Sequence, residues 1–285
     1  MNRIVLFLAT NFAVIAVLSV VLNVLGFNQP GQDMTPLLVM AAVMGMGGSF
    51  ISLLLSKTMA IRGMGANVIT QPQSETETWL LATVRRQADR LGLGMPDVAV
   101  FRNPAPNAFA TGSNRDHALV AVSSGLLERM GRDEVEAVLG HEMSHVANGD
   151  MVTLTLIQGV LNTFVMVFAS LLASVLDRGR DGRGMGYYLG YMVAQMLLGF
   201  LASLIVFWFS RRREFRADAG GAELAGRPKM IAALQRLQEA SQPPLPGSLA
   251  AFGISGGKKS GLARLLMTHP PLEDRIAALR AGNSG

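Results

Sequence analysis

The sequence Leu139-Gly-His-Glu-Met-Ser-His-Val-Ala147 places two of the chain's four histidines around one glutamate. In a helix, predicted here over Arg132–Asn148, His141 and His145 stand on the same face because they are four residues apart. Two imidazoles so placed can hold one zinc ion. Glu142 lies beside that face, close enough to take a proton from water at the ion without being a ligand. The stretch therefore predicts a metal-hydrolase site, and the simpler interpretation is a pair of surface histidines on a solvated helix.

The neighbouring residues favour the helix and its metal site. Acidic side chains occupy the expected first turn at Asp133 and Glu134, and Gly149 with Asp150 provides an exit after the last turn. Apolar residues recur between these ends at helical spacing, namely Val135, Val138 and Leu139. This context supports the metal site over the surface pair.

The composition indicates a membrane protein. Of the 285 residues, 50% are hydrophobic and only 16% are charged, so membrane spans are expected. The chain has no cysteine, which excludes disulfides and thiolate metal ligands. The net charge is +5, and arginines cluster at the edges of apolar runs, which favours an anionic membrane surface over nucleic acid as a partner. These arginines are Arg62, Arg211, Arg212, Arg213 and Arg216.

Two apolar runs near the start of the sequence predict transmembrane helices. Ile4–Gly26 follows Arg3 and is long enough to cross a hydrocarbon core of about 30 Å. A cleaved signal peptide is the alternative, but the run is long for one and no clear cleavage site follows it. Pro36–Leu55 is the second run, in which Gly45 and Ser49 give a small-residue face for close helix contact.

Positive charge predicts the orientation of this pair of spans. The loop between the two runs has no lysine or arginine, whereas Lys57 and Arg62 follow the second run. By the positive-inside rule, both ends of the pair face the cytoplasm.

From Gln71 the composition becomes that of a soluble domain. Ser74 and Glu77 form a capping box that opens a helix ending at Gly92. Three extended segments follow, at residues 98–101, 106–110 and 118–122. Because these strands directly precede the zinc helix, a small sheet is expected beside the metal.

Two further apolar runs, Val152–Leu176 and Tyr187–Phe209, flank the charged turn Asp177–Arg183. If a third zinc ligand lies beyond Phe209, it must be on the same side of the membrane as His141. The chain between them then crosses an even number of times. Two full spans and a re-entrant hairpin both satisfy this condition, and the sequence leaves both open.

A third ligand is needed because a catalytic zinc normally has three protein ligands and one open position. Residues 211–219 look helical, and Glu214 there can be the ligand. Asp218, on the same face, can then accept the other N–H of a ligating histidine. On spacing alone, the alternative is that Glu214 pairs with Arg211 on the helix surface.

The remaining segments are two helices and a loop. Arg227-Pro228 starts a helix that runs to Ala240. Residues 241–261 form a loop whose content of proline, glycine and serine predicts mobility. Thr268-His-Pro-Pro271 precedes a last helix that runs through Leu279.

These features divide the chain into four parts. Residues 1–56 hold two N-terminal transmembrane helices and residues 57–150 the first part of a catalytic domain. Residues 151–210 form a hydrophobic hairpin and residues 211–285 the second part of the catalytic domain. The expected fold is a mainly α integral membrane protein with a zincin-like α+β metalloprotease domain, in which a small sheet lies beside the histidine helix.

Several motifs in this order resemble the HtpX family of bacterial membrane zinc metalloproteases, relatives of the eukaryotic CAAX prenyl protease. The likeness rests on Leu139–His145 and on Ser210-Arg-Arg-Arg-Glu-Phe-Arg-Ala-Asp218. Asn107-Ala-Phe-Ala-Thr-Gly112, the hydrophobic hairpin and Thr268-His-Pro-Pro271 add to it. The resemblance covers nearly the whole chain, and no residue that the chemistry needs departs from the pattern.

The resemblance implies one Zn²⁺ per chain, bound by His141, His145 and Glu214, with Glu142 as the catalytic base. It also implies a cell inner membrane protein whose catalytic domain faces the cytoplasm. Its role would be membrane-protein quality control, especially under heat or envelope stress. The expected substrates are membrane proteins or unfolded polypeptides, and the oligomeric state stays open.

Two other residues receive roles through the resemblance. Asn107 lies on the strand that holds the substrate backbone in related proteases, and the alternative is an asparagine that caps a turn. His269 is similar to the late histidine that relatives use near the transition-state oxyanion. Its alternative is a helix-entry histidine before two prolines. His117 is interpreted as an ordinary turn histidine.

Two other functions compete with a protease at the membrane surface. An intramembrane protease would carry the histidines within a span, but the charged flank Arg132–Glu136 argues against this. A multi-pass scaffold or transport protein with a structural zinc would need a fourth protein ligand, or ionisable groups inside its spans. The apolar runs contain polar side chains but no acid or base, which favours anchoring over transport.

Overall fold

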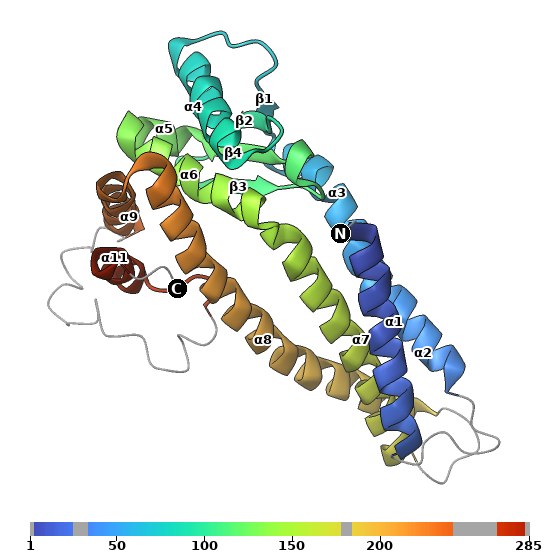
Figure 1. The fold of residues 1–285 in the computed structure, drawn as a ribbon. Coiled ribbons are helices and arrows are strands. Elements are labelled where there is room, and N and C mark those ends of the chain that lie inside the picture. Colours follow the sequence, from blue (N-terminus) through green and yellow to red (C-terminus); the bar gives the residue numbers. More distant parts are fainter. Residues whose placement is uncertain (1–2, 25–33, 178–183, 242–266, 283–285) are drawn as a thin grey trace, which may run out of the picture. The chain divides into compact units, whose positions relative to one another are not determined.

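The computed structural model describes residues 3–24, 34–177, 184–241 and 267–282 (Figure 1). This part of the chain is mostly helical and falls into two compact units. One unit comprises Met1–Leu54 with Val152–Val206, and the other comprises Leu55–Met151 with Phe207–Gly285. The loop predicted to be mobile at residues 241–261 lies outside the described residues, apart from its first residue.

Long apolar helices make up the first unit. They are α1 (Arg3–Val24), α2 (Thr35–Ala42) with its continuation through the π-helix η1 (Val43–Gly47) into α3 (Gly48–Met64), α7 (Asp150–Leu176) and α8 (Met185–Ala225). The part of α3 after Leu54 and the part of α8 after Val206 belong to the second unit. By length and composition, Thr35–Met64, α7 and α8 can each cross a membrane. The first predicted span is helical, but its described apolar part, Ala9–Val24, is shorter, so a crossing there stays a prediction.

The predicted small-residue face in the first unit is confirmed. A Cβ added to Gly45 would lie 2.5 Å from Thr163 Oγ1, and a Cβ added to Gly159 would lie 3.5 Å from Ser49 Cβ. Thr163 Oγ1 donates a hydrogen bond to the carbonyl of Gly159 at 2.9 Å, which keeps its hydroxyl satisfied. Only small residues let two helices approach this closely.

The second unit is built on a four-stranded sheet with the order β1-β2-β4-β3. The strands are β1 (Asn67–Val68), β2 (Asp97–Phe101), β3 (Ala108–Thr111) and β4 (Leu119–Ser123). β2 and β4 run parallel, and β1 and β3 are antiparallel edge strands. The three predicted strands are confirmed, whereas the two-residue β1 is too short to show an alternating pattern in the sequence.

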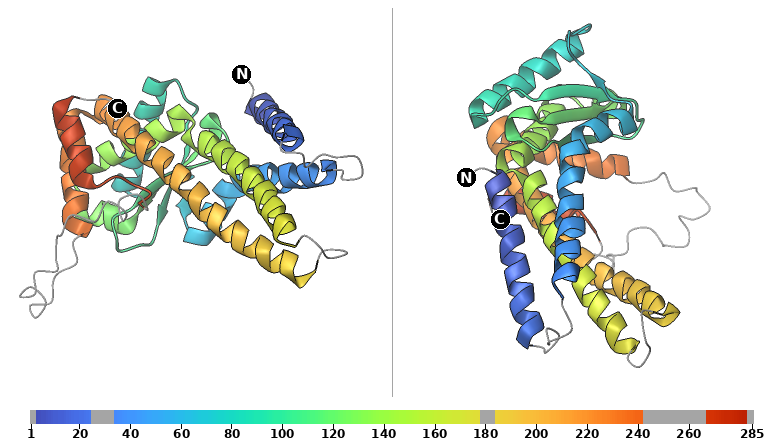
Figure 2. Two further views of the ribbon diagram at one scale, coloured as in Figure 1. Left: turned by 90° about the horizontal axis from the view of Figure 1, so that it is seen from below. Right: turned by 90° about the vertical axis from the view of Figure 1, so that its right-hand side faces the viewer.

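Alternating side chains give this sheet two apolar faces. Val98, Val120 and Val122 share a core with α4 (Glu75–Leu91), α5 (Ser124–Arg129) and α6 (Arg132–Asn148). Figure 2 shows the ribbons of these helices beside the sheet. The opposite face packs against the end of α3 and consists of Ala99, Phe101, Leu119 and Ala121. Because β4 is covered on both faces, all five of its residues are buried.

The helix ends in this unit follow their predicted signals. Ser74 Oγ accepts a hydrogen bond from the Glu77 N–H at 3.2 Å, and the Glu77 carboxylate accepts one from the Gln73 N–H at 2.7 Å. α4 is capped by Gly92 at φ 62° and α6 by Gly149 at φ 69°. Glycine adopts this left-handed conformation without the steric cost that other residues carry.

Helix α8 differs from the sequence prediction. It is one helix of 41 residues, where the sequence suggested a span followed by a separate helix around Glu214. No proline or glycine stands between Phe209 and Phe215, so the backbone has no reason to break there. The unit is completed by α9 (Arg227–Ser241) and α11 (Leu272–Ala281).

Two glycines let α6 and α8 approach closely in the second unit. A Cβ added to Gly140 would lie 3.3 Å from Gly221 Cα, and one added to Gly221 would lie 2.9 Å from the backbone nitrogen of His141. Glu214 and Asp218 lie seven and three residues before Gly221, on the same face of α8. The close approach therefore brings both carboxylates to His141.

Gly221→Ala is expected to destabilise the protein by about 1–3 kcal/mol, because the added methyl group must push α6 and α8 apart. Thermal unfolding in detergent measures this effect. Gly199→Ala is the matched control on the same helix, since no described atom lies within 4 Å of its added Cβ. Alanine's higher helix propensity predicts an unchanged or raised unfolding temperature for the control. Equal behaviour of the two variants would contradict a tight contact at Gly221.

Candidate metal centre

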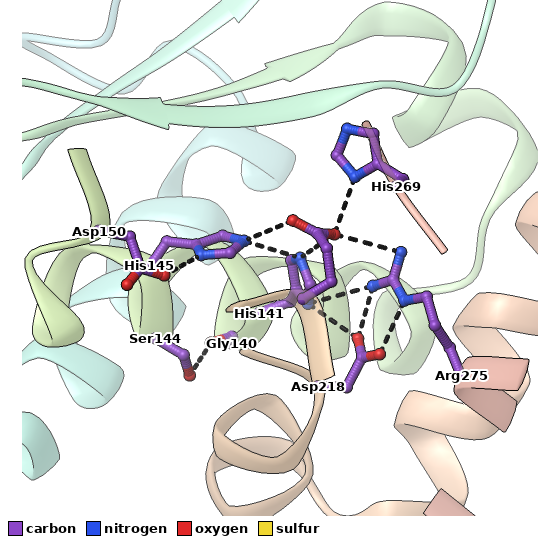
Figure 3. Close-up of polar contacts among 9 residues, drawn as sticks. Gly140, His141, Ser144, His145, Asp150, Asp218, His269 and Arg275 are labelled. Atoms are coloured by element: carbon purple, nitrogen blue, oxygen red, sulfur yellow. Dashed lines mark hydrogen bonds and ion pairs between the residues drawn. The ribbon is translucent and has the colours of Figure 1, made fainter. Parts of the chain in front are cut away.

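Helix α6 presents His141 and His145 on one buried face, with their Nε2 atoms 3.2 Å apart (Figure 3). His141 Nδ1 lies 2.9 Å from Asp218 Oδ1. His145 Nδ1 lies 2.6 Å from Asp150 Oδ2. Because a carboxylate accepts hydrogen bonds, each Nδ1 carries a proton, and in the neutral ring each Nε2 is left with a lone pair. Two lone pairs at this distance repel each other unless a cation or a shared proton lies between them.

Glu214 brings a carboxylate from α8 to the same point. Its side chain is 1% exposed, with Oε1 3.4 Å from His145 Nε2 and Oε2 3.6 Å from His141 Nε2. Oε1 accepts no hydrogen bond from any residue that the structure describes. A buried carboxylate oxygen without such a bond is costly unless a cation is near it.

The structure thus gathers the three predicted ligand residues, and their donor atoms all lie within 4.8 Å of one another. Two imidazole nitrogens with one carboxylate oxygen suit zinc and similar transition metals, whereas magnesium and calcium prefer oxygen alone. The bare Nε2 pair and the unbonded Oε1 of Glu214 therefore fit a metal ion.

Arg275 of α11 belongs to this site, and the sequence analysis missed it. Its Nε donates to Asp218 Oδ2 at 2.7 Å, and its Nη2 donates to Oδ1 at 2.5 Å. Its Nη1 lies 3.4 Å from Glu214 Oε2. The two-pronged contact neutralises the buried Asp218 and fixes its orientation toward His141. A signal was present, because Arg275 stands in the apolar stripe of the last helix, whose other members are Leu272, Ile276 and Leu279.

Asp150 is the other residue whose role the sequence analysis missed, since it appeared there only as part of a helix exit. It is 2% exposed, and its carboxylate accepts a hydrogen bond from the His145 Nδ1–H. Arg216 Nη2 lies 3.9 Å from its second oxygen. An aspartate directly after the capping Gly149, and five residues after the histidine, was the signal in the sequence.

A cavity of about 130 Å³ opens beside the ligands, and Glu142, Asn107 and His269 all line it. Glu142 is partly exposed, which suits a base that must meet water. His269 Nδ1 lies 2.9 Å from Glu214 Oε2, although 61% of the His269 side chain is exposed. Asn107 is fixed by its main chain, whose N–H donates to Ser123 Oγ at 2.9 Å and whose carbonyl accepts from the Ser123 N–H at 2.8 Å.

His117 is not among the residues that line this cavity. It ends the short turn helix η2 (Arg115–His117), and its Nδ1 lies 3.3 Å from Asn114 Nδ2. Its interpretation as a turn histidine is confirmed.

Both histidines hold protons tightly in the metal-free protein. Burial lowers the pKa of His141, but its hydrogen bond to Asp218 and the nearby Glu214 carboxylate outweigh burial and raise the pKa from 6.5 to about 9. Burial also lowers the pKa of His145, but the Asp150 and Glu214 carboxylates outweigh it, so the pKa of His145 is raised as well. Protons and a metal ion therefore compete for the same Nε2 atoms.

The raised pKa of His141 predicts opposite pH responses of the metal-free and metal-loaded proteins. The folded metal-free protein binds this proton more tightly than the unfolded chain, so its stabilisation is full below pH 6.5 and is lost as pH rises to about 9. The loss amounts to roughly 3 kcal/mol. Metal affinity should rise over the same range. Thermal unfolding at pH 6.5 and pH 9, with and without chelator, measures both trends, and a stripped protein that gains stability with pH would contradict them.

Comparisons with known proteins identify the family. Residues 74–282 match the model of peptidase family M48. The chain belongs to this family. The protease HtpX of Xanthomonas campestris pv. campestris (strain B100) is 61% identical over 288 residues, covering 99% of this chain and 98% of that protein. The protease HtpX of Xanthomonas oryzae pv. oryzae (strain MAFF 311018) is 62% identical over the same coverage.

A solved structure shares the fold of this M48 chain. The crystal structure of S. mikatae Ste24p superposes with a TM-score of 0.61 at 17% identity, over 85% of this chain. The chain spans 58% of the length of that protein. The predicted resemblance, the fold class and the enzyme class are therefore confirmed, and the chain is a membrane metalloprotease of family M48. The scaffold or transport interpretation is set aside.

Proposed function

We propose that the chain is a zinc-dependent endopeptidase of the cell inner membrane that hydrolyses misfolded or damaged membrane proteins as part of quality control and the stress response. The observation that carries the proposal is the buried cluster of His141, His145 and Glu214 beside an open cavity. Its nitrogen-rich donor set favours zinc, and three ligands leave one position open, as in catalytic rather than structural sites.

The residues around the cluster have separate tasks in peptide hydrolysis. When bound, the ion supplies Lewis acidity, which polarises a carbonyl and makes water easier to deprotonate. Glu142 accepts the proton of the attacking water and delivers it to the leaving amine nitrogen. Asp218 and Asp150 hold the two Nδ1 protons, so that both Nε2 lone pairs point at one place.

Two residues at the rim of the cavity contact the substrate in this proposal. His269 donates a hydrogen bond to the carbonyl oxygen as negative charge develops there, which its largely exposed ring beside Glu214 permits. Asn107 stands directly before the edge strand β3, whose outer side can take a substrate backbone as an added strand.

The membrane position of the site is also a proposal. Asp150, which holds His145, is the first residue of α7, a helix long and apolar enough to cross a membrane. Residues 1–56 and 151–210 would anchor the chain, and residues 57–150 and 211–285 would form the catalytic domain in the cytoplasm. A site so close to the bilayer supports membrane proteins, or unfolded chains at that surface, as substrates.

The zinc content and activity of the purified protein in detergent test the proposed chemistry. We expect about one zinc per chain, cleavage of an unfolded model protein, loss of cleavage after chelation, and recovery when zinc is added back. Tightly bound zinc without any cleavage would point to a structural ion and would overturn the proposal.

The absence of cysteine permits a clean test of orientation. Glu239 is 67% exposed on α9, so Glu239→Cys creates a single accessible thiol. A membrane-impermeant maleimide should label it only after the cells are opened. Labelling in intact cells stripped of their outer membrane would place the catalytic domain on the outer side of the inner membrane.

A further inference from the structure

We infer that the cavity beside the metal ligands is a specificity pocket for an apolar side chain next to the peptide bond that is cut, an inference that rests on the proposed function. The ligands form only one part of the cavity wall. Asn107, Glu142, His269 and Arg275 add polar side chains to the wall. The remaining wall is apolar and includes residues of α5, α6 and α9, namely Leu126, Val138, Met230, Leu234 and Leu237.

This apolar wall is part of the main core of the second unit. Leu126 and Leu234 are fully buried, Met230 is 1% exposed and Val138 is 7% exposed, so these four residues back the cavity, while the partly exposed Leu237 presents its open surface. All of them pack in the core that joins the sheet to the helices. Because core side chains are held at close-packed density, the wall keeps its shape when a substrate enters.

The charges around the cavity do not favour a charged occupant. Arg275 lines it, but its guanidinium is already paired with two carboxylates. It donates two hydrogen bonds to Asp218, and its Nη1 lies 3.4 Å from Glu214 Oε2. It therefore offers no free cation to an acidic side chain, and Glu142 repels one. A basic side chain would have to bury its charge against the apolar wall, which is costly.

The position of Val138 places the pocket directly beside the reacting bond. Val138 stands three residues before His141 and four before Glu142, so the three side chains line one face of α6. The apolar wall thus begins one helical turn, about 5.4 Å, from the base. When the scissile carbonyl of a substrate lies within reach of Glu142, the side chain of the substrate residue next to it lies against this wall.

The volume sets an upper limit on that side chain. An apolar cavity of roughly 150 Å³ holds a benzene molecule, and this one measures about 130 Å³. Leucine and methionine side chains therefore fit, phenylalanine is at the limit because its side chain is larger than benzene, and tryptophan is too large. Such residues are abundant in the apolar segments of membrane proteins.

Cleavage-site mapping tests the inference. The zinc-loaded full chain in detergent digests an unfolded protein, mass spectrometry locates the cuts, and peptides that differ only at one residue flanking the cut are then compared. We expect leucine to be cleaved at least about 10-fold faster than alanine, aspartate or lysine at that position. Rates within twofold for all four, or a preference for a charged residue, would overturn the pocket. A complete lack of cleavage with zinc bound would instead be a failure of the proposed function.

Matched variants of α9 locate the pocket. Leu237→Ala widens it and should raise the rate for tryptophan relative to leucine about 10-fold. Ile231→Ala, on the same helix and also partly buried, does not line the cavity and should leave this ratio unchanged. Val138→Leu narrows the pocket and should lower the phenylalanine-to-leucine ratio. Ratios measured within one variant are insensitive to the fraction of misfolded protein, so an unchanged ratio in both pocket variants would overturn the assignment.

Discussion

Glu142→Gln is expected to keep the metal and to lower the turnover number by about 10²–10⁴-fold, the usual contribution of a general base. Glutamine preserves the size and polarity of the side chain but cannot accept a proton from water. The three ligand residues are untouched, so metal content measured on the purified variant should equal that of the wild type. Cleavage of an unfolded protein at saturating concentration measures the turnover.

The matched control for Glu142 is Glu136→Gln on the same helix. Glu136 pairs with Lys229 at 2.7 Å and Arg86 at 3.2 Å, away from the cavity. Losing these partly exposed pairs costs at most about 1 kcal/mol of stability and should not change turnover. A Glu142→Gln variant that cleaves as fast as this control would remove Glu142 from the role of base. Loss of metal would show instead that Glu142 helps to bind the ion.

Glu214→Ala is expected to weaken metal affinity by more than about 100-fold and to abolish cleavage at low metal concentration. Loss of a group that merely hydrogen-bonds a metal ligand costs about 10–100-fold, so loss of a ligand should cost more. Titration of the stripped protein with zinc against a competing chelator measures the affinity directly, without reference to activity.

A graded series separates the ligand from its neighbours. Asp218→Asn should fall in the 10–100-fold range, because Asp218 acts on the ion through His141. Glu223→Ala, at an exposed position of the same helix, should bind zinc like the wild type. If Asp218→Asn weakens affinity more than Glu214→Ala does, the roles of the two carboxylates must be exchanged.

Local sequence signals predicted the elements of this fold well. The capping residues at Ser74 and Gly149 and the apolar stripe of α6 depend on neighbours within a few residues, and all lie where they were expected. The continuous α8 was missed because a charged segment after a span looks like a new element. A helix has no reason to end at a change of polarity alone.

The partners of the site were harder to predict than its ligands. The histidine spacing is local, whereas the hydrogen bond from His141 to Asp218 spans 77 residues and its contact with Arg275 spans 134. Contacts between residues so far apart along the chain produce no periodic pattern in the sequence. Glu214 itself stayed open on spacing and was assigned by resemblance, since an acid among arginines also suits a surface pair.

The separation of the site residues along the chain sets the order in which a newly made protein becomes active. The ribosome makes His141 and His145 first, then the apolar helix α7 and most of α8, and only afterwards Glu214, Asp218 and Arg275. Until the later segment emerges, the two histidines lack their third ligand and the aspartate that orients His141. A nascent chain thus exposes no working protease to the translating ribosome or to other unfinished proteins beside it, and this delay comes from the order of the residues alone.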